Sequence, residues 1–123
     1  MICSRWKTAT FDIDRATEFT GDDVDQYSSL VDLEKPYTIL IIDAPTIDAS
    51  TVSVAVQEED GVTQVPVLMH YTKSDDSSAA WATTAGTGGY SITCLIYGHQ
   101  FVRIKCGSNQ TADRVFKVRG VRA

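Results

Sequence analysis

The residues of this chain that could hold a metal or act as nucleophiles are few and widely spaced. A structural zinc site needs four thiolate or imidazole ligands in short paired spacings, and the chain has no C-x-x-C and no H-x₃₋₅-H pair. A catalytic serine or cysteine needs a histidine oriented by an acid, and no G-x-S-x-G elbow is present. We therefore expect no metal site and no catalytic residues. The residues considered are Cys3, Cys94, Cys106, His70 and His99.

Two further patterns suggest ligand binding only superficially. The run Gly86-Thr87-Gly88-Gly89 lacks the Lys-Ser/Thr that completes a phosphate loop, so it predicts backbone freedom at a loop end. Two acidic clusters, Asp12/Asp14 and Gly21-Asp22-Asp23-Val24-Asp25, could offer oxygens to calcium. No bidentate glutamate of an EF-hand loop follows the second cluster, and solvated acidic turns are the favoured interpretation. The sequence predicts no cofactor.

Aromatic residues give the one candidate for ligand recognition. Trp81, Tyr71, Tyr90 and Tyr97 could form a platform on which sugar rings stack. Aromatic residues in β-proteins more often pack in the core or across strands. Both interpretations remain open at this point.

Length and composition indicate one folded domain over residues 1–123. The chain has 43% hydrophobic and 22% charged residues, which argues against wholesale disorder. It has no apolar run near the roughly 20 residues that span a bilayer, and its start lacks an apolar signal-peptide core. We expect a cytosolic protein that makes no membrane contact. Its three cysteines favour free thiols over a disulfide framework, with a Cys94–Cys106 disulfide as the alternative.

Charge is unevenly distributed. Residues 1–100 contain 15 acids and 5 bases, whereas residues 101–123 contain one acid, Asp113, and six bases. The acidic body excludes general nucleic-acid binding. The basic C-terminal part could contact an anion or a partner, but cross-strand pairing with acids is the favoured interpretation.

The segment Tyr90–Cys106 has the clearest strand signal and is the predicted centre of the fold. Hydrophobic residues alternate on both sides of a turn at Gly98, which is typical of a β-hairpin. Because alternate side chains of a strand face opposite ways, Val102, Ile104 and Cys106 are predicted to face the core, with Arg103 and Lys105 facing out.

The rest of the chain predicts further short strands and one long loop. The strand count is seven to eight, with frequent turn signals, which indicates an all-β antiparallel sandwich or barrel. Residues 1–35 could also form an extended segment that contacts neighbours. The predicted strands are Trp6–Ile13, with Ala9, Phe11 and Ile13 inward; Tyr27–Leu33, short or at an edge; Tyr37–Ile42, covered on both faces; Thr51–Gln57, with Val52, Val54 and Val56 inward and Ser53 and Ala55 outward; Val62–Tyr71, its hairpin partner; and Val115–Val121. The loop is Lys73–Gly89.

Two stretches resemble small virion proteins of tailed phages. TVSVAVQEEDG followed by VPVL is similar to a β-hairpin of that family. GHQFVRIKCGSNQTADRVFKVRG is similar to its pattern of an aromatic-hydrophobic-Arg-hydrophobic strand, a polar loop with Gln-x-Ala, and a last apolar strand. The similarity covers roughly residues 50–72 and 98–121. The family is that of jelly-roll head-decoration, or cement, proteins and related phage structural proteins.

The resemblance implies a jelly-roll that binds and stabilises a phage capsid and has no enzymatic activity. Its expected partner is the major capsid protein, its location is the virion after assembly in the host cytoplasm, and it would form a homo-oligomer, with a trimer as one option. Alternatives are a carbohydrate-binding or fibre domain for host attachment, and a tail or neck structural protein. The candidate partner-contact residues are Tyr37, Ile39, Ile41, Trp81 and Arg119.

Overall fold

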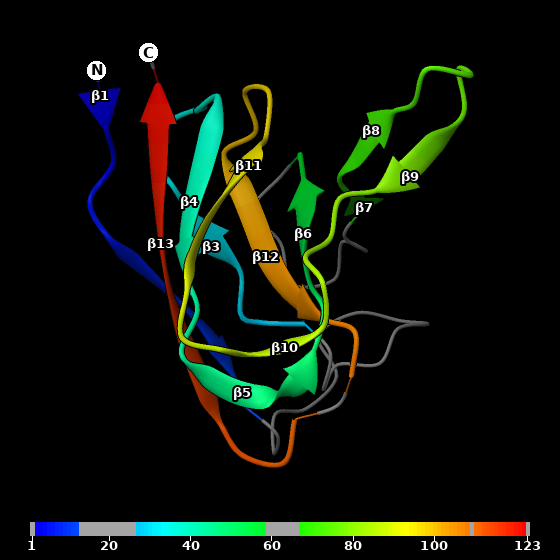
Figure 1. Cartoon of the computed structure of the whole chain (residues 1–123). Coiled ribbons are helices and arrows are strands. Elements are labelled where there is room, and N and C mark those ends of the chain that lie inside the picture. Colours follow the sequence, from blue (N-terminus) through cyan, green and yellow to red (C-terminus); the bar gives the residue numbers. More distant parts are fainter. Residues whose placement is uncertain (1, 13–26, 59–66, 109, 123) are drawn as a thin grey trace.

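The computed structural model describes residues 2–12, 27–58, 67–108 and 110–122. Within these ranges every regular element is a strand (Figure 1), and no helix that could span a membrane is present. The strands are β1 (Ile2–Cys3), β2 (Lys7–Phe11), β3 (Val31–Asp32), β4 (Ile39–Asp43), β5 (Thr46–Ser50), β6 (Val52–Gln57), β7 (Val67–Leu68), β8 (His70–Thr72), β9 (Ser78–Ala80), β10 (Gly86–Gly88), β11 (Ser91–Leu95), β12 (Phe101–Cys106) and β13 (Arg114–Arg122).

Nine of the described strands form two antiparallel sheets, and eight of them, all except β1, have jelly-roll topology. The first sheet has the order β2-β13-β4-β11, and β1 pairs with the C-terminal end of β13. The second sheet has the order β3-β12-β6-β7. The chain changes sheet between most successive strands, and the first and last long strands, β2 and β13, lie side by side. The predicted all-β, antiparallel, jelly-roll-like sandwich is confirmed.

The predicted hairpin between residues 90 and 106 is wrong. β11 pairs with β4, with Ile92 opposite Ile42, whereas β12 pairs with β6, with Ile104 opposite Val54. The turn at Tyr97 and Gly98, both with positive φ, therefore carries the chain from one sheet to the other. Strands on opposite sides of one core show the same hydrophobic alternation as two strands of a hairpin, so alternation could not distinguish the two arrangements.

The inward row of β12 is predicted correctly, but the outward row is not. Val102, Ile104 and Cys106 are fully buried in the core. Arg103 is also 0% exposed, which contradicts its predicted position in solvent. Lys105 is half-buried, and its ammonium lies 5.2 Å from the centre of the Tyr27 ring. Alternation separates the two faces of a strand, but it does not reveal whether the second face is covered.

Arg103 is buried among hydrogen-bond acceptors from both neighbouring segments. Its Nε donates to Oε1 of Gln57 at 2.9 Å, and its Nη1 donates to the carbonyl of Ser28 at 3.0 Å. Gln57 belongs to β6, and Ser28 precedes β3 on the other side of β12. A buried charge is tolerated only where such partners replace water. The guanidinium therefore links three adjacent segments of the second sheet.

In the segment Thr51–Gln57, the valines predicted to face the core do so. The residues predicted to face outward are covered as well. β6 is buried along its whole length, and Val52, Val54 and Val56 belong to the main core. Ala55, on the other face, packs in a small cluster with Tyr27 and Leu68. The predicted hairpin partner Val62–Tyr71 is confirmed at Val67–Leu68, where β7 pairs with β6, but it is wrong at His70 and Tyr71, which belong to β8 and pair with β9. Most of its turn, residues 59–66, lies outside the described residues.

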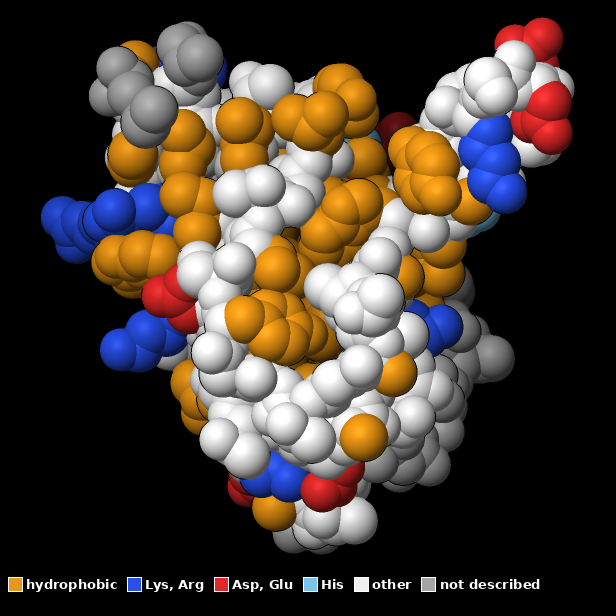
Figure 2. All heavy atoms as spheres, in the orientation of Figure 1, with side chains coloured by type: hydrophobic (Ala, Val, Ile, Leu, Met, Phe, Trp, Pro, Cys, Tyr) orange, Lys and Arg blue, Asp and Glu red, His pale blue; other side chains and the backbone are white. Residues whose placement is uncertain are grey.

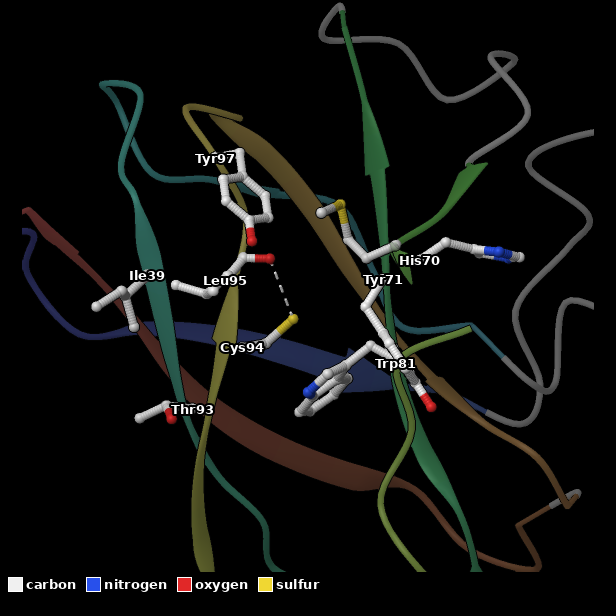
Figure 3. Close-up of a pocket in the computed structure, with 9 residues that line it drawn as sticks. Ile39, His70, Tyr71, Trp81, Thr93, Cys94, Leu95 and Tyr97 are labelled. Atoms are coloured by element: carbon white, nitrogen blue, oxygen red, sulfur yellow. Dashed lines mark hydrogen bonds between the residues drawn. The ribbon is translucent and has the colours of Figure 1, made fainter. Parts of the chain in front are cut away.

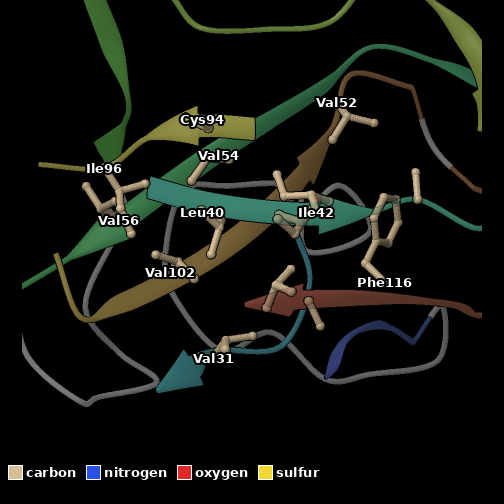
Figure 4. Close-up of a cluster of buried hydrophobic side chains, with 14 of the residues drawn as sticks. Val31, Leu40, Ile42, Val52, Val54, Val56, Cys94, Ile96, Val102 and Phe116 are labelled. Atoms are coloured by element: carbon tan, nitrogen blue, oxygen red, sulfur yellow. The ribbon is translucent and has the colours of Figure 1, made fainter. Parts of the chain in front are cut away.

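The main core lies between the sheets and takes side chains from both (Figure 4). Leu40 and Ile42 of β4 point inward, while the alternate residues Ile39 and Ile41 are half-buried on the outer face. In β2, Ala9 and Phe11 are inward as predicted, and Phe11 stacks at 5.4 Å, centre to centre, on Phe116 of β13. Ile13, Asp14 and the acidic stretch around Asp22 and Asp23 lie outside the described residues.

The predicted long loop Lys73–Gly89 is wrong in part, because it contains two strands. β9 pairs with β8, and β10 pairs with β5. These strands are short and consist largely of small and polar residues without clear alternation, so no sequence pattern indicates them. The segment 27–33 is confirmed at an edge, since β3 is the outermost strand of the second sheet.

All three cysteines are free thiols, so the alternative of a Cys94–Cys106 disulfide is wrong. Cys94 and Cys106 are buried, one in each sheet, while Cys3 is exposed. Burial raises the pKa of Cys94 to about 12 and that of Cys106 to about 11. Only the thiolate reacts with alkylating agents, so these two side chains are protected both sterically and chemically.

Iodoacetamide is expected to label Cys3 rapidly in the folded protein, and Cys94 and Cys106 only after unfolding. The reason is the burial of the latter two thiols and their raised pKa values. Mass spectrometry of the protein labelled at about pH 8, with and without denaturing urea, measures this. A Cys3→Ser variant should take up no label while folded. Rapid labelling of Cys94 in the folded protein would contradict the described packing.

Candidate functional site

A two-stranded arm projects from the sandwich (Figure 1). A cleft lies between this arm and the first sheet. The arm consists of residues 70–80, in which β8 and β9 pair antiparallel, with His70 opposite Ala80 and Thr72 opposite Ser78. We call the space the arm cleft. It has a volume of about 220 Å³ and is lined by Ile39, Met69, His70, Tyr71, Trp81, Thr93, Cys94, Leu95 and Tyr97.

The base of the arm is hydrogen-bonded to β6 of the second sheet. The amide of Met69 donates to the carbonyl of Val54 at 2.9 Å, and the amide of Trp81 donates to the carbonyl of Met69 at 2.8 Å. Met69 and Trp81 also pack against the main core. At the far end, Asp75 accepts hydrogen bonds from the amide and hydroxyl of Ser77, which close the turn. The core therefore fixes the base of the arm, whereas its turn is exposed.

Three aromatic residues line the arm cleft (Figure 3). The Trp81 indole extends from the base of the arm toward Cys94 on β11, and the Tyr97 ring lies beside Leu95. Tyr71 and Tyr97 are 53% and 70% exposed, which leaves their ring faces available to a partner. Of the proposed stacking platform, the structure brings together Trp81, Tyr71 and Tyr97. Tyr90 packs against the core elsewhere.

The polar groups at the arm cleft include the thiol of Cys94 and the backbone of His70. The pKa of Cys94 is raised to about 12 by burial, so its thiol is neutral at physiological pH. Its Sγ donates to the carbonyl of Leu95 at 3.5 Å. The His70 ring points away from the cleft (Figure 3), and its Nδ1 lies 3.1 Å from Oγ of Ser78. Among the described residues, no group of three or more potential metal ligands occurs.

The residues predicted to contact partners do not all gather in one place. Ile39 and Trp81 line the arm cleft. Ile41 is half-buried on the outer face of the first sheet, next to Arg119 on the adjacent strand β13. The Arg119 guanidinium stacks 4.6 Å from the centre of the Trp6 ring. Tyr37 is buried, with its ring against Gly120.

Leu95 forms part of the exposed rim of the cleft and is not among the residues predicted to contact a partner. It lies on the outer face of β11, where it is exposed beside the half-buried Ile39 of β4. Leu95 alternates with the buried Cys94 and Ile96, and an apolar residue in such an outward position is the signal that the sequence carries.

A polar cluster secures the loop that resembles the phage proteins. Asp48 of β5 accepts hydrogen bonds at Oδ2 from the amide and hydroxyl of Thr111, and at Oδ1 from Nη2 of Arg114. Gln110 accepts from the amide of Asp48 at 2.8 Å. The Gln-x-Ala loop is therefore fixed to β5 by side chains. These bonds, those from Thr111 above all, lower the pKa of Asp48.

Asp48→Asn is expected to lower stability at neutral pH, and the difference from the wild type should shrink in acid. A carboxyl group whose pKa is lowered by folding stabilises the fold above its unfolded pKa, which for an aspartate is ordinarily near 3.8. That contribution is lost as the pH falls through the lower, folded value. Urea midpoints measured from neutral pH into acid would test this. A difference that stays constant below pH 3.8 would contradict the role of the carboxylate.

Comparison with known proteins gives information about the fold. Neither a protein-family model nor a curated protein matches the chain. Among solved structures, the crystal structure of the SPBc2 prophage-derived protein YomS matches with a TM-score of 0.51 and 16% sequence identity. The match covers 98% of this chain and 95% of that chain. At this identity the likeness shows the fold alone, so the chain has a fold similar to that of a prophage-derived protein.

Proposed function

We propose that the protein is a non-enzymatic virion structural protein that binds a phage capsid and stabilises it, with the major capsid protein as its partner. The observation that carries this proposal is the apolar surface formed by the arm cleft and the outer face of β4 and β11. In Figure 2, hydrophobic side chains extend across this face toward the projecting arm. Extended apolar surfaces of this kind mark sites of protein–protein contact.

Two further points support the proposal. The fold resembles that of a prophage-derived protein, and two stretches of the sequence resemble phage decoration proteins. A protein that adheres to a seam between capsid subunits needs a rigid body and an exposed contact surface. The sandwich supplies the first, and the arm cleft, with the exposed Leu95 and Tyr97, supplies the second. The place of action would be the virion, assembled in the host cytoplasm.

Binding to capsids tests the proposal directly. Capsids assembled without this protein should bind it and should then disassemble at a higher temperature in scanning calorimetry. Truncation of central aromatic contacts commonly costs about 2 kcal/mol or more of binding energy, so Tyr97→Ala with Leu95→Ala should weaken binding by at least about tenfold. Both side chains are exposed, so the fold should be preserved.

Val67→Ala provides the matched control, because Val67 is an exposed apolar residue on the second sheet, away from the cleft. It should bind like the wild type. No binding of the wild-type protein, or equal weakening by the control, would reject the proposal. If the protein instead occupies the tail or neck, a particle map would show it there, as the structural alternative predicts.

Carbohydrate binding is the second candidate, because Trp81, Tyr71 and Tyr97 converge on one cleft. A fibre or host-attachment domain would stack sugar rings on these side chains. A glycan array with the wild-type protein and the Trp81→Ala variant separates the two functions. A signal that Trp81→Ala abolishes would favour this candidate, and an empty array would eliminate it.

A further inference from the structure

The edge of the first sheet at β1 and β2 and the turn of the arm carry opposite charge in the described residues. At this edge, five cations lie on or beside β1, β2 and β13, against the acids Glu34 and Asp43. Across the arm cleft from β11, the turn of the arm carries Asp75 and Asp76 against Lys73. Figure 2 shows blue side chains along one flank and red ones at the tip of the arm on the other. The five cations, which we call the basic edge, are Arg5, Lys7, Lys117, Arg119 and Arg122.

The basic edge and the arm also expose apolar side chains. At the basic edge, Ile2 is 49% and Trp6 is 42% exposed. Trp6 also borders a shallow hollow of about 360 Å³, together with Lys7, Thr8, Asp43 and Lys117. At the arm, Tyr71 is exposed on β8. The basic edge and the arm therefore each combine an exposed aromatic residue with charge, and the two charges have opposite sign.

Most of the arm is exposed to solvent. All residues of β8 are exposed, and so are the turn residues 73–77. An isolated two-stranded hairpin is marginally stable in water, and the described contacts of the arm with the sandwich are at its base, through Met69 and Trp81. A partner that covers the arm would supply the burial that it lacks.

We infer that the arm of one copy docks on the basic edge of a second copy, so that the chains associate head to tail. Opposite charge on the arm and on the basic edge favours this contact over arm-to-arm or edge-to-edge pairing, both of which bring like charges together. A head-to-tail pair leaves one arm and one basic edge without a partner. Further copies can therefore add to the pair until a ring closes. This association requires no capsid and can be tested on the purified protein.

Sedimentation velocity tests for association. The protein should sediment as a multiple of 13.5 kDa at low salt, and it should dissociate as salt rises from about 50 mM to about 500 mM, because salt screens exposed charges. A monomer at every concentration and salt level would overturn the inference. This outcome would leave the capsid proposal standing, since that proposal concerns binding to a different protein.

Charge exchange tests the geometry. The arm variant Ser74→Lys/Asp76→Asn makes the turn positive and retains a residue type that tolerates the positive φ of Asp76. The edge variant Arg5→Glu/Arg122→Glu makes the basic edge more acidic at two exposed positions. Each variant alone should weaken association by at least about tenfold, since like charges then meet.

Combining the arm substitutions with the edge substitutions distinguishes head-to-tail from symmetric contacts. A chain that carries both sets should associate again, because its positive arm meets an acidic edge. An equimolar mixture of the two single-end variants should also associate. Failure of both recombinations would overturn the head-to-tail arrangement. Glu58→Lys, at the exposed end of β6, is the control that should leave association unchanged, and urea melts would confirm that all variants are folded.

Discussion

Arg103→Ala is expected to lower the free energy of unfolding by about 3–5 kcal/mol, the sum of a cavity and of unsatisfied acceptors. The side chain is fully buried and links β12 to β6 and to the segment before β3. Its removal leaves Oε1 of Gln57 and the carbonyl of Ser28 without the donors that it supplies. Urea unfolding followed by tryptophan fluorescence would measure the loss.

Lys105→Ala is the matched control, since Lys105 is the next base along the same face of β12. It is half-buried, and its contact with the Tyr27 ring is a cation–π interaction at the surface, so the cost should be under about 1 kcal/mol. Arg103→Lys should also lower the free energy of unfolding substantially, because one ammonium cannot reproduce the forked geometry of the guanidinium. Equal effects of Arg103→Ala and Lys105→Ala would show that Arg103 is not buried as described.

Gly88→Ala is expected to destabilise the protein by about 2–4 kcal/mol, from overpacking and backbone strain together. Gly88 has φ +82°, and a Cβ built there would lie 1.8 Å from the carbonyl oxygen of Pro45. That oxygen belongs to the backbone just before β5, so relief requires β5 and β10 to separate. Urea unfolding would report the change.

Gly86→Ala on the same strand provides the control for this prediction. A Cβ at Gly86 meets no atom within 4 Å, and its φ is not in the left-handed region. We expect this substitution to change stability by less than about 0.5 kcal/mol or to raise it slightly. A near-neutral Gly88→Ala would mean that the chain passes Pro45 at a greater distance than described.

Much of the fold could be predicted because hydrophobic alternation reports which side chains face the core. It placed Val102, Ile104 and Cys106 correctly, together with the inward rows of β2 and β6. Alternation carries no information on which strands are neighbours, so β11 and β12 were paired wrongly. Nor does it reveal a covered second face, so Arg103 was placed in solvent. Both failures concern contacts between segments far apart in the chain.

The candidate site was predictable only in part, for a related reason. Trp81, Tyr71 and Tyr97 could be recognised as aromatic residues able to stack, but their convergence depends on the arm. The strands of the arm are three residues long and rich in serine, alanine and threonine, so they have no distinctive pattern. The charge asymmetry was visible in the sequence. The placement of opposite charge on the arm and on the basic edge depends on the topology.

The position of β13 between β2 and β4 has a consequence for biosynthesis. These two strands are made well before β13, yet each forms hydrogen bonds with it. Until β13 emerges, one edge of each is unpaired, and unpaired edges invite association with other chains. Closure of the first sheet must therefore wait for the synthesis of β13, and a topology with such distant pairings folds slowly, in about milliseconds to seconds.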